Sequence, residues 1–208
     1  MSGQAGIIAG MIRTAVIGLR AHSGWAALVA LAGPVSAPEV IARRRIEIAD
    51  PGIRGSKQPF HAAEQLEFPD AKAYIERCAA STRTLARAAL QAAMDGLRDR
   101  RAESTSCGII LASGKALPGL EAILKSHALI HTAEGEFFRN ALVEACAHCG
   151  LAVLGVKQKE LHAQAAAKLR TPSSTLERRV QEMGKALGPP WTEDQKFATL
   201  AAWLVLGK

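Results

Sequence analysis

Two histidines with helical spacing are the first side chains in this sequence that suit chemistry. On a continuous helix, His127 and His131 lie on one face, where both imidazoles can bind a zinc ion. Glu134 or Glu136 is a candidate third ligand. The HExxH arrangement of metalloproteases is missing, and the alternative is that these residues cap and bridge a junction between helices. The sequence therefore leaves open a metal site at His127, His131 and Glu134.

A second candidate site lies in two predicted turns, each of which follows an apolar run. The turns are Arg20-Ala21-His22-Ser23-Gly24 and Ser113-Gly114-Lys115. Ligands of open α/β sheets bind in crevices outside the strand ends. Small residues there let backbone N–H groups approach a phosphate, and the two basic side chains add charge. Neither turn matches the P-loop or GxGxxG pattern, so ordinary turns are the alternative.

A pair of cysteines has the CxxC spacing, in the segment Cys146-Ala147-His148-Cys149. Redox-active pairs of this kind lie at helix N-termini, where the helix dipole lowers the thiol pKa. This pair is predicted at a helix C-terminus instead. A zinc site would need two further ligands, and none is nearby in the sequence. We therefore predict buried or half-buried structural cysteines.

Composition limits the class of protein. The 208 residues are 49% hydrophobic and 22% charged, which is typical of a globular protein with a core. The net charge of +7 favours polyanionic partners, nucleic acid first, although basicity also serves solubility. Four cysteines are too few for a disulfide framework and fit a reducing cytoplasm. No apolar run reaches the roughly 18–20 residues of a membrane-spanning helix, so no membrane partner is expected.

Apolar runs and the turns between them predict the elements that position these residues. Residues 14–19, 25–31 and 39–49 resemble strands joined by short turns, which predicts an antiparallel meander. Within the third strand, arginines 43–45 indicate a solvated edge that discourages strand pairing, with phosphate contact as the alternative. The Gly- and Pro-rich residues 50–69 are predicted to form a loop.

Helices and strands alternate in the remainder of the chain. A long helix over residues 70–98 carries a stripe of Leu85, Ala88, Ala89 and Ala92 that can face a sheet. The other predicted elements are strands at 106–112 and 151–156, and helices at 118–126, 133–149 (capped by Thr132), 159–169, 173–187 and 192–206.

This order, a three-strand meander followed by alternating helices and strands, predicts an α/β fold. A mixed sheet would begin with the antiparallel three-strand meander, continue with alternating helices and strands, and end in a helical C-terminus, with helices covering the sheet. Residues 1–13 are expected to be a flexible N-terminal extension, and residues 14–208 a single domain.

This order resembles the ribonuclease H-like fold, and within it the Holliday-junction-resolvase and actin-like ATPase branches. The first strand and turn, VIGLRAHSGWAALVAL, are similar to the opening strand of such proteins, which ends in a carboxylate. Here Arg20 stands at that position. Resolvases place another acid at the end of the central strand, where this chain has Ala112-Ser113-Gly114. Asp194, in WTEDQKFATLAAW and beside Glu193, matches the closing acid on the last helix.

The resemblance implies a metal chemistry that these residues support only in part. Two-metal phosphoryl transfer needs several carboxylates that converge on ions about 3.5–4 Å apart. An arginine at the first acidic position would repel such ions. Standard nuclease chemistry is therefore expected to be absent or rebuilt from other groups. The cofactor, where one is bound, would be a divalent metal ion: Mg²⁺, Mn²⁺ or Zn²⁺.

Three hypotheses of function come from different classes. The first is a ribonuclease H-like protein that binds or processes nucleic acid with a degenerate active site. The second is a metal-dependent or small-molecule enzyme that uses His127, His131 and Glu134. The third is a noncatalytic assembly protein whose alanine-rich helices form an interface in a homo-oligomer.

The first hypothesis assigns roles to residues at the predicted strand ends and at the start of the last helix. Its catalytic candidates are Asp194, His22 and Ser113. Its ligand- or phosphate-binding candidates are Arg20, Ser23, Gly24, Gly114 and Lys115.

Overall fold

The computed structural model describes residues 12–112 and 116–207. Most of the expected N-terminal extension, and the predicted site residues Ser113, Gly114 and Lys115, lie outside the described residues. The first elements are β1 (Arg13–His22), β2 (Trp25–Ala32), β3 (Glu39–Glu47), α1 (Pro59–Ala63), α2 (Phe68–Arg98) and β4 (Ala102–Leu111). They are followed by α3 (Leu120–Leu124), α4 (His127–His148), β5 (Ala152–Lys157), η1 (Gln158–Glu160), α5 (Leu161–Leu169), α6 (Ser173–Leu187) and α7 (Glu193–Leu206).

The strands form one mixed sheet in the order β3-β2-β1-β4-β5. β1, β2 and β3 pair antiparallel as the predicted meander, and β1, β4 and β5 run parallel. The parallel strands need crossover connections, which α2 and α4 provide. The predicted α/β class, with its N-terminal meander and helical C-terminus, is confirmed.

The first strand extends further than predicted. Residues 20–22 were expected in a turn, but they belong to β1, and His22 pairs directly with Trp25 of β2. The turn therefore has only two residues, Ser23 and Gly24, and Gly24 adopts a φ of +80°, which glycine accepts without strain. Such a tight hairpin lets strand pairing continue to its tip, so Arg20 and His22 are held by the sheet.

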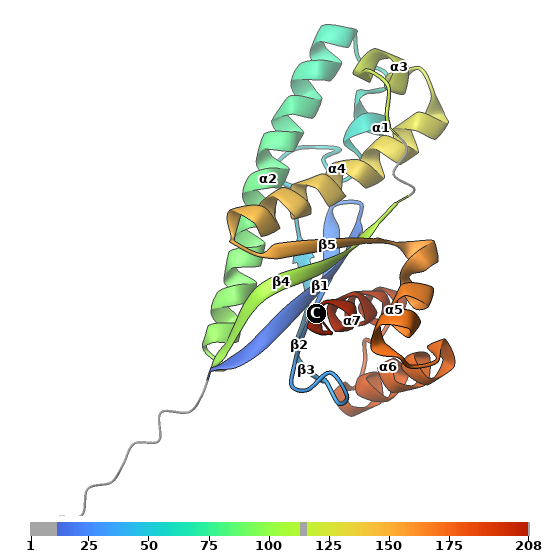
Figure 1. Cartoon of the computed structure of the whole chain (residues 1–208). Helices are drawn as coiled ribbons and strands as arrows, with labels where there is room; N and C mark the ends of the chain where they lie inside the picture. Colours follow the sequence, from blue (N-terminus) through green and yellow to red (C-terminus); the bar gives the residue numbers. More distant parts are fainter. Residues whose placement is uncertain (1–11, 113–115, 208) are drawn as a thin grey trace, which may run out of the picture.

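Helices cover the two faces of the sheet unequally (Figure 1). α2 and α4 pack on one face, against Ala15, Ile17 and Leu19 of β1. α7 packs on the other face, with α5 and α6 outside it. Because side chains alternate along a strand, Val16, Gly18, Arg20 and His22 all belong to the α7 face. No helix within the described ranges is long and apolar enough to cross a membrane.

α7 lies unusually close to the sheet at a pair of glycines. Gly18 of β1 and Gly108 of β4 are directly paired across the parallel strands. A Cβ built on Gly18 would lie 1.8 Å from the carbonyl oxygen of Ala198, and one on Gly108 would lie 2.3 Å from that of Ala201. The helix backbone therefore occupies the space of two missing side chains. Every residue of α7 from 198 to 205 is buried.

Two long helices differ from their predictions, α2 in the face that it buries and α4 in the residue at which it begins. The buried stripe of α2 includes Thr82, Ala86, Leu90, Ala93 and Leu97, whereas Ala88 and Ala92 of the predicted stripe are exposed. Both stripes have helical spacing. The stripe that packs against the sheet lies one residue further along the chain than the predicted one. α4 begins at His127 and is continuous to His148, so that Thr132 lies inside it and its hydroxyl donates to the Ala128 carbonyl.

The arginine run of β3 lies on an edge strand, as predicted. Arg44 and Arg45 are exposed, and Arg45 lies over the Trp25 ring at 3.9 Å. Arg43 is not solvated, because its guanidinium donates to four carbonyls that follow the end of α6. The acceptors are Leu187, Gly188, Pro189 and Pro190, at 2.6–3.3 Å. Arg43 thus ties the sheet edge to the connection between α6 and α7.

The glycine contact predicts a large stability difference between two alanine substitutions. We expect Gly18→Ala to lower the free energy of unfolding by about 3 kcal/mol, because the new methyl group has to push α7 away from β1. Gly119→Ala is the matched control. Gly119 is exposed, has a φ of −61° and has no atom within 4 Å of the added Cβ, so its change should stay below about 1 kcal/mol. Urea unfolding measures both values, and equal effects would contradict the packing argument.

Candidate functional site: a cationic cavity at the strand ends

The three parallel strands end at one edge of the sheet and enclose a cavity of about 310 Å³. We call it the strand-end cavity. Its wall comes from the ends of β1, β4 and β5, from the first residues of η1, and from α4. The lining residues are Arg20, Ala21, Ile110, Leu111, Ala112, Arg139, Lys157, Gln158 and Lys159.

The wall of this cavity is cationic. Of the lining residues in the described part of the chain, four are basic and none is acidic: the basic ones are Arg20, Arg139, Lys157 and Lys159. Glu136 lies 3.3 Å from Arg139, and Glu160 lies 3.8 Å from Lys157, but neither carboxylate is part of the wall. A ligand in the cavity therefore meets cations, while the carboxylates that pair with them lie outside the wall.

Arg139 is positioned by its own helix. Gly135 precedes it by one turn in α4, and a Cβ on Gly135 would lie 2.7 Å from the Arg139 guanidinium. A glycine inside a helix costs about 1 kcal/mol relative to alanine, and here it makes room for the arginine to fold back along α4. The Arg139 side chain is only 16% exposed. Its guanidinium is therefore held in one place.

The centre of the site is a contact between β1 and the start of α7. Arg20 donates from Nε to Asp194 Oδ1 at 2.8 Å, and His22 Nε2 lies 2.6 Å from the same oxygen. Arg20 also donates to Gln158 Oε1 at 2.8 Å, and its guanidinium lies 4.6 Å from the centre of the Phe197 ring. Three groups thus orient Arg20, one from η1 and two from α7.

The other two members of this contact are also fixed. His22 stacks flat on Trp25, with ring centroids 4.4 Å apart. Asp194 lies in the first turn of α7, where the helix dipole favours a carboxylate. Thr192 and Gln195 form a capping box that begins the helix at this point.

The environment of Asp194 favours its ionised form. Partial burial acts to raise the pKa of this carboxyl. The hydrogen bonds and charges of His22 and Arg20 outweigh burial, so that the pKa is lowered from the ordinary value of 3.8. Asp194 is therefore a carboxylate at neutral pH, and its charge is already matched by Arg20 inside the site.

This arrangement suits an anion better than a pair of metal ions. A metal ion at Asp194 would have to displace Arg20 and His22 from Oδ1 and then stand beside an arginine. Asp194 lies outside the cavity wall, and none of the wall residues that the structure describes carries a carboxylate. Charge-assisted donors such as Arg20 and Arg139 bind phosphate or carboxylate groups instead.

The structure brings some predicted site residues together and separates others. Arg20, His22 and Asp194 meet, although they are far apart in the sequence. Ser23 and Gly24 form the hairpin tip and are not part of the cavity wall. The Gly24 carbonyl accepts hydrogen bonds from the backbone N–H groups of Ile48 and Ala49, so this turn packs against the two residues that follow β3.

Three lining residues were missed by the sequence reasoning: Lys157, Gln158 and Lys159. Residues 157–159 follow an apolar strand in the same way as the two turns that were singled out. The rule that ligands bind at strand ends would therefore have found them. No comparable signal marks Arg139, because only the packing of α4 brings it to this edge.

The predicted metal ligands lie elsewhere, at the start of α4. His127 and His131 do share one face, with 3.0 Å between their Nε2 atoms. Their third neighbour is His61 of α1, which lies in the segment predicted as a loop. Glu134 is buried and contacts His61, with its Oε1 2.9 Å from His61 Nδ1. The cysteine pair at the other end of α4 holds a buried Cys146 and a half-buried Cys149, and burial raises the pKa of the Cys149 thiol.

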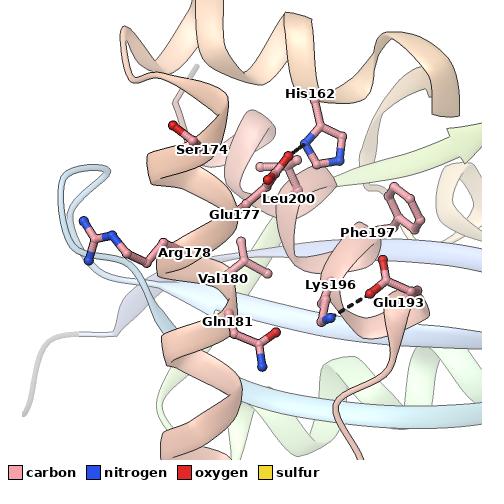
Figure 2. A pocket seen from close by; sticks show the side chains of 10 residues that line it. All are labelled: His162, Ser174, Glu177, Arg178, Val180, Gln181, Glu193, Lys196, Phe197 and Leu200. Atoms are coloured by element: carbon pink, nitrogen blue, oxygen red, sulfur yellow. Dashed lines mark hydrogen bonds and ion pairs between the residues drawn. The ribbon is translucent and has the colours of Figure 1, made fainter.

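A larger cavity of about 470 Å³ lies among α5, α6 and α7 (Figure 2). Each of its charged groups has a partner of opposite sign or, for His162, a neighbouring carboxylate. His162 lies 3.2 Å from Glu177, Lys196 lies 2.6 Å from Glu193, and Arg178 lies 2.8 Å from Glu182 outside the wall. The apolar part of its wall includes Val180, Phe197 and Leu200. Since its charges are satisfied internally, this cavity is a weaker candidate for an anion than the strand-end cavity.

The arrangement of strands and helices defines an α/β protein with a ribonuclease H-like fold. Among solved structures, this chain is similar to a Thermus thermophilus RuvC structure, with a TM-score of 0.51 and 10% identity over 91% of each chain. RuvC of T. thermophilus in complex with Holliday junction substrate gives a TM-score of 0.49 and 10% identity, over 92% of this chain and 91% of that chain. An Aquifex aeolicus member of the Ppx/GppA family gives a TM-score of 0.35 and 14% identity, over 76% of this chain and 40% of that chain. No protein-family model and no curated protein sequence matches this chain.

The lowered pKa of Asp194 predicts a pH-dependent contribution to stability. Because the pKa is lower in the folded protein, the stabilisation is complete above the unfolded value of 3.8 and is lost as the pH falls through the folded value. We expect Asp194→Asn to lower the free energy of unfolding by about 1–3 kcal/mol at pH 7. The difference from the unsubstituted protein should shrink below about pH 4.

Urea unfolding between pH 7 and pH 3 measures this difference. Glu193→Gln is the control, because Glu193 pairs with Lys196 near the surface and is 70% exposed. Exposed pairs of this kind contribute up to about 1 kcal/mol. A stability difference for Asp194→Asn that stays constant over the whole pH range would mean that its carboxylate charge is not what stabilises the contact.

Proposed function

We propose that this protein binds nucleic acid through the phosphate backbone at the strand-end cavity, and that it does so without two-metal nuclease chemistry. One observation carries the proposal: among the residues that the structure describes, the wall of the cavity holds four basic side chains and no acidic one, at the carboxyl ends of three parallel strands. Crevices at such strand ends are where open α/β sheets bind ligands.

The arginines and the lysines of the wall have different roles in the proposed binding. Arg20 and Arg139 are mostly buried, at 18% and 16% exposure, and each is held by a carboxylate. Their planar guanidinium groups are preorganised to donate two hydrogen bonds to a phosphate. Lys157 is 43% exposed and, like Lys159, acts as a mobile point charge at the rim. Such a set holds phosphates without reading bases.

The proposal favours nucleic acid over other anions for two reasons. The whole chain carries a net charge of +7, which raises the rate of encounter with a polyanion. The element order resembles that of resolvase-like nucleases, and the fold is the ribonuclease H-like fold that this resemblance implied. Within that fold, Arg20 stands where the resemblance implies the opening carboxylate, so we infer that phosphate binding here uses cations in place of metal ions.

The proposal predicts a loss of salt dependence when the rim cations are removed. We expect the double variant Lys157→Gln, Lys159→Gln to bind labelled single-stranded and duplex DNA and RNA more weakly. The slope of log affinity against log salt concentration should fall by about 1.4–1.8, because each lost phosphate contact removes about 0.7–0.9. Fluorescence anisotropy between about 50 and 200 mM salt measures the slope.

The control for this titration makes two lysine-to-glutamine changes outside the strand-end cavity. Lys185 is exposed near the end of α6 and does not line the cavity. Lys185→Gln with Lys168→Gln alters the net charge by the same amount. If both double variants reduce the slope equally, binding depends on net charge rather than on the strand-end cavity. Absence of binding by the unsubstituted protein would end the proposal.

The contact between His22 and Asp194 favours a second candidate function, metal-independent hydrolysis of a phosphodiester. Asp194 Oδ1 lies 2.6 Å from His22 Nε2, and a carboxylate in this position orients an imidazole. The other ring nitrogen, Nδ1, can then take a proton from water or from a ribose hydroxyl. Arg20, bound to the same carboxylate oxygen, stands ready to receive a phosphate.

This candidate predicts cleavage that survives chelation of metal ions. We expect RNA or DNA to be cut in the presence of excess EDTA, with the rate of His22→Ala reduced by about 100-fold or more, the usual contribution of a general base. Glu193→Gln, one residue before Asp194 but outside the contact, should keep the full rate. Cleavage that disappears with EDTA, or that His22→Ala leaves intact, would eliminate His22 as the base.

A further inference from the structure

Three histidines from two helices meet at the start of α4, outside the strand-end cavity. His61 comes from α1, and His127 and His131 come from the first turns of α4. One ligand nitrogen from each of the three lies within 4.8 Å of the other two. Their ring centroids are 4.5–5.3 Å apart and the rings meet edge to face. The cluster thus converges on a small volume.

The spacing suits one tetrahedral metal ion. With Zn–N bonds of about 2.0–2.1 Å, two ligand nitrogens of a tetrahedral site are about 3.3 Å apart. The Nε2 atoms of His127 and His131 are separated by 3.0 Å, so a bound ion requires only a small outward movement of the rings. The side chain of His61 is 22% exposed and those of the other two are on the surface, which leaves room for this movement.

Glu134 is a buried carboxylate beside His61. It is 4% exposed, and its Oε1 lies 2.9 Å from Nδ1 of His61 and accepts the His61 backbone N–H at 3.2 Å. Nδ1 of His61 is close to this carboxylate but makes no hydrogen bond of good geometry. The negative charge beside Nδ1 favours the tautomer with its proton there, so that Nε2 of His61 carries the lone pair for a metal. Histidines that bind metals almost always have such a partner.

Without a metal ion, the same geometry has a simpler explanation. One of the two imidazoles on α4 can donate a hydrogen bond to the other at 3.0 Å. That hydrogen bond does not account for His61, which joins the cluster from another helix with its opposite edge held by a buried carboxylate. Burying a carboxylate is expensive unless it has a charged or hydrogen-bonding partner, and here that partner is a third imidazole of the cluster.

We infer that His61, His127 and His131 form a binding site for a transition-metal ion, Zn²⁺ first, with Glu134 orienting His61. Three imidazole nitrogens favour Zn²⁺ over Mg²⁺ and Mn²⁺, which prefer oxygen ligands. Glu134 is then the partner of a ligand, rather than the third ligand that the sequence suggested. The fourth coordination position faces solvent and takes a water molecule, as in zinc sites with three protein ligands.

Binding would join α1 to α4 over a small hydrophobic cluster. The buried residues of this cluster include close sequence neighbours of the histidines: Phe60, Ala63, Ile130 and Ala133. α1 has only five residues and follows a long irregular segment, so an ion that bridges the two helices would hold α1 in place. This site is separate from the strand-end cavity, and its test is independent of the proposed function.

Titration of the metal-free full chain with Zn²⁺ alone, followed by calorimetry, tests the inference. We expect one Zn²⁺ per chain and a loss of affinity greater than tenfold in each of His61→Ala, His127→Ala and His131→Ala. Glu134→Gln should weaken binding by about 10–100-fold, as the loss of a partner of a ligand does. His127 and His131 are exposed, so their variants report on binding even if the buried Glu134 variant fails to fold.

His148→Ala is the control, since His148 is exposed at the other end of α4 and should leave the affinity unchanged. Co²⁺ replaces Zn²⁺ in a second measurement, in which nitrogen ligands give no sulfur-to-metal charge-transfer absorption. Appearance of that absorption would assign the ion to Cys146 and Cys149 and overturn the inference. Full affinity in His127→Ala and His131→Ala, or no Zn²⁺ binding by the unsubstituted chain, would overturn it as well.

Discussion

The close approach of α7 to the sheet is the constraint on which the other features of this molecule depend. Gly18 and Gly108, paired side by side, leave no side chains between the sheet and the backbone of Ala198 and Ala201. The helix can therefore lie against the middle of the sheet, and its first turn reaches the strand ends. Asp194 meets Arg20 and His22 only because of this approach. A helix held away by side chains would leave these three groups apart.

The same alternation of side chains along β1 supplies both the packing surface and the site. Gly18, Arg20 and His22 are on one face because they are two residues apart. Ile17 and Leu19, on the other face, belong to the core under α2 and α4. A shift of one residue in the pairing of β1 would bury the arginine and the histidine under those helices. Register therefore ties the stability of the fold to the position of the basic groups.

Much of the fold could be predicted from the sequence, because turns and apolar runs are local signals. The order of elements, the meander and the helix starting after Thr192 required no knowledge of distant contacts. The face that α2 buries could not be read in this way, since Ala86 and Ala88 belong to stripes of equal quality and only the sheet selects between them. The two candidate sites could likewise be predicted only in part. Strand ends can be recognised in the sequence, whereas the position of Arg139 depends on how α4 packs and that of His61 on how α1 packs.

The position of α7 also bears on how the chain folds. Its partner β1 is near the start of the described chain, and the contact of Arg20 with Asp194 spans 174 residues. Until α7 has been synthesised, one face of the sheet, including Val16, Val29 and Ile110, has no cover from it. Closing so long a loop is entropically costly and slows folding. Chains that lack α7 would expose this apolar face, so the glycine pair, by admitting α7, also protects the sheet from aggregation.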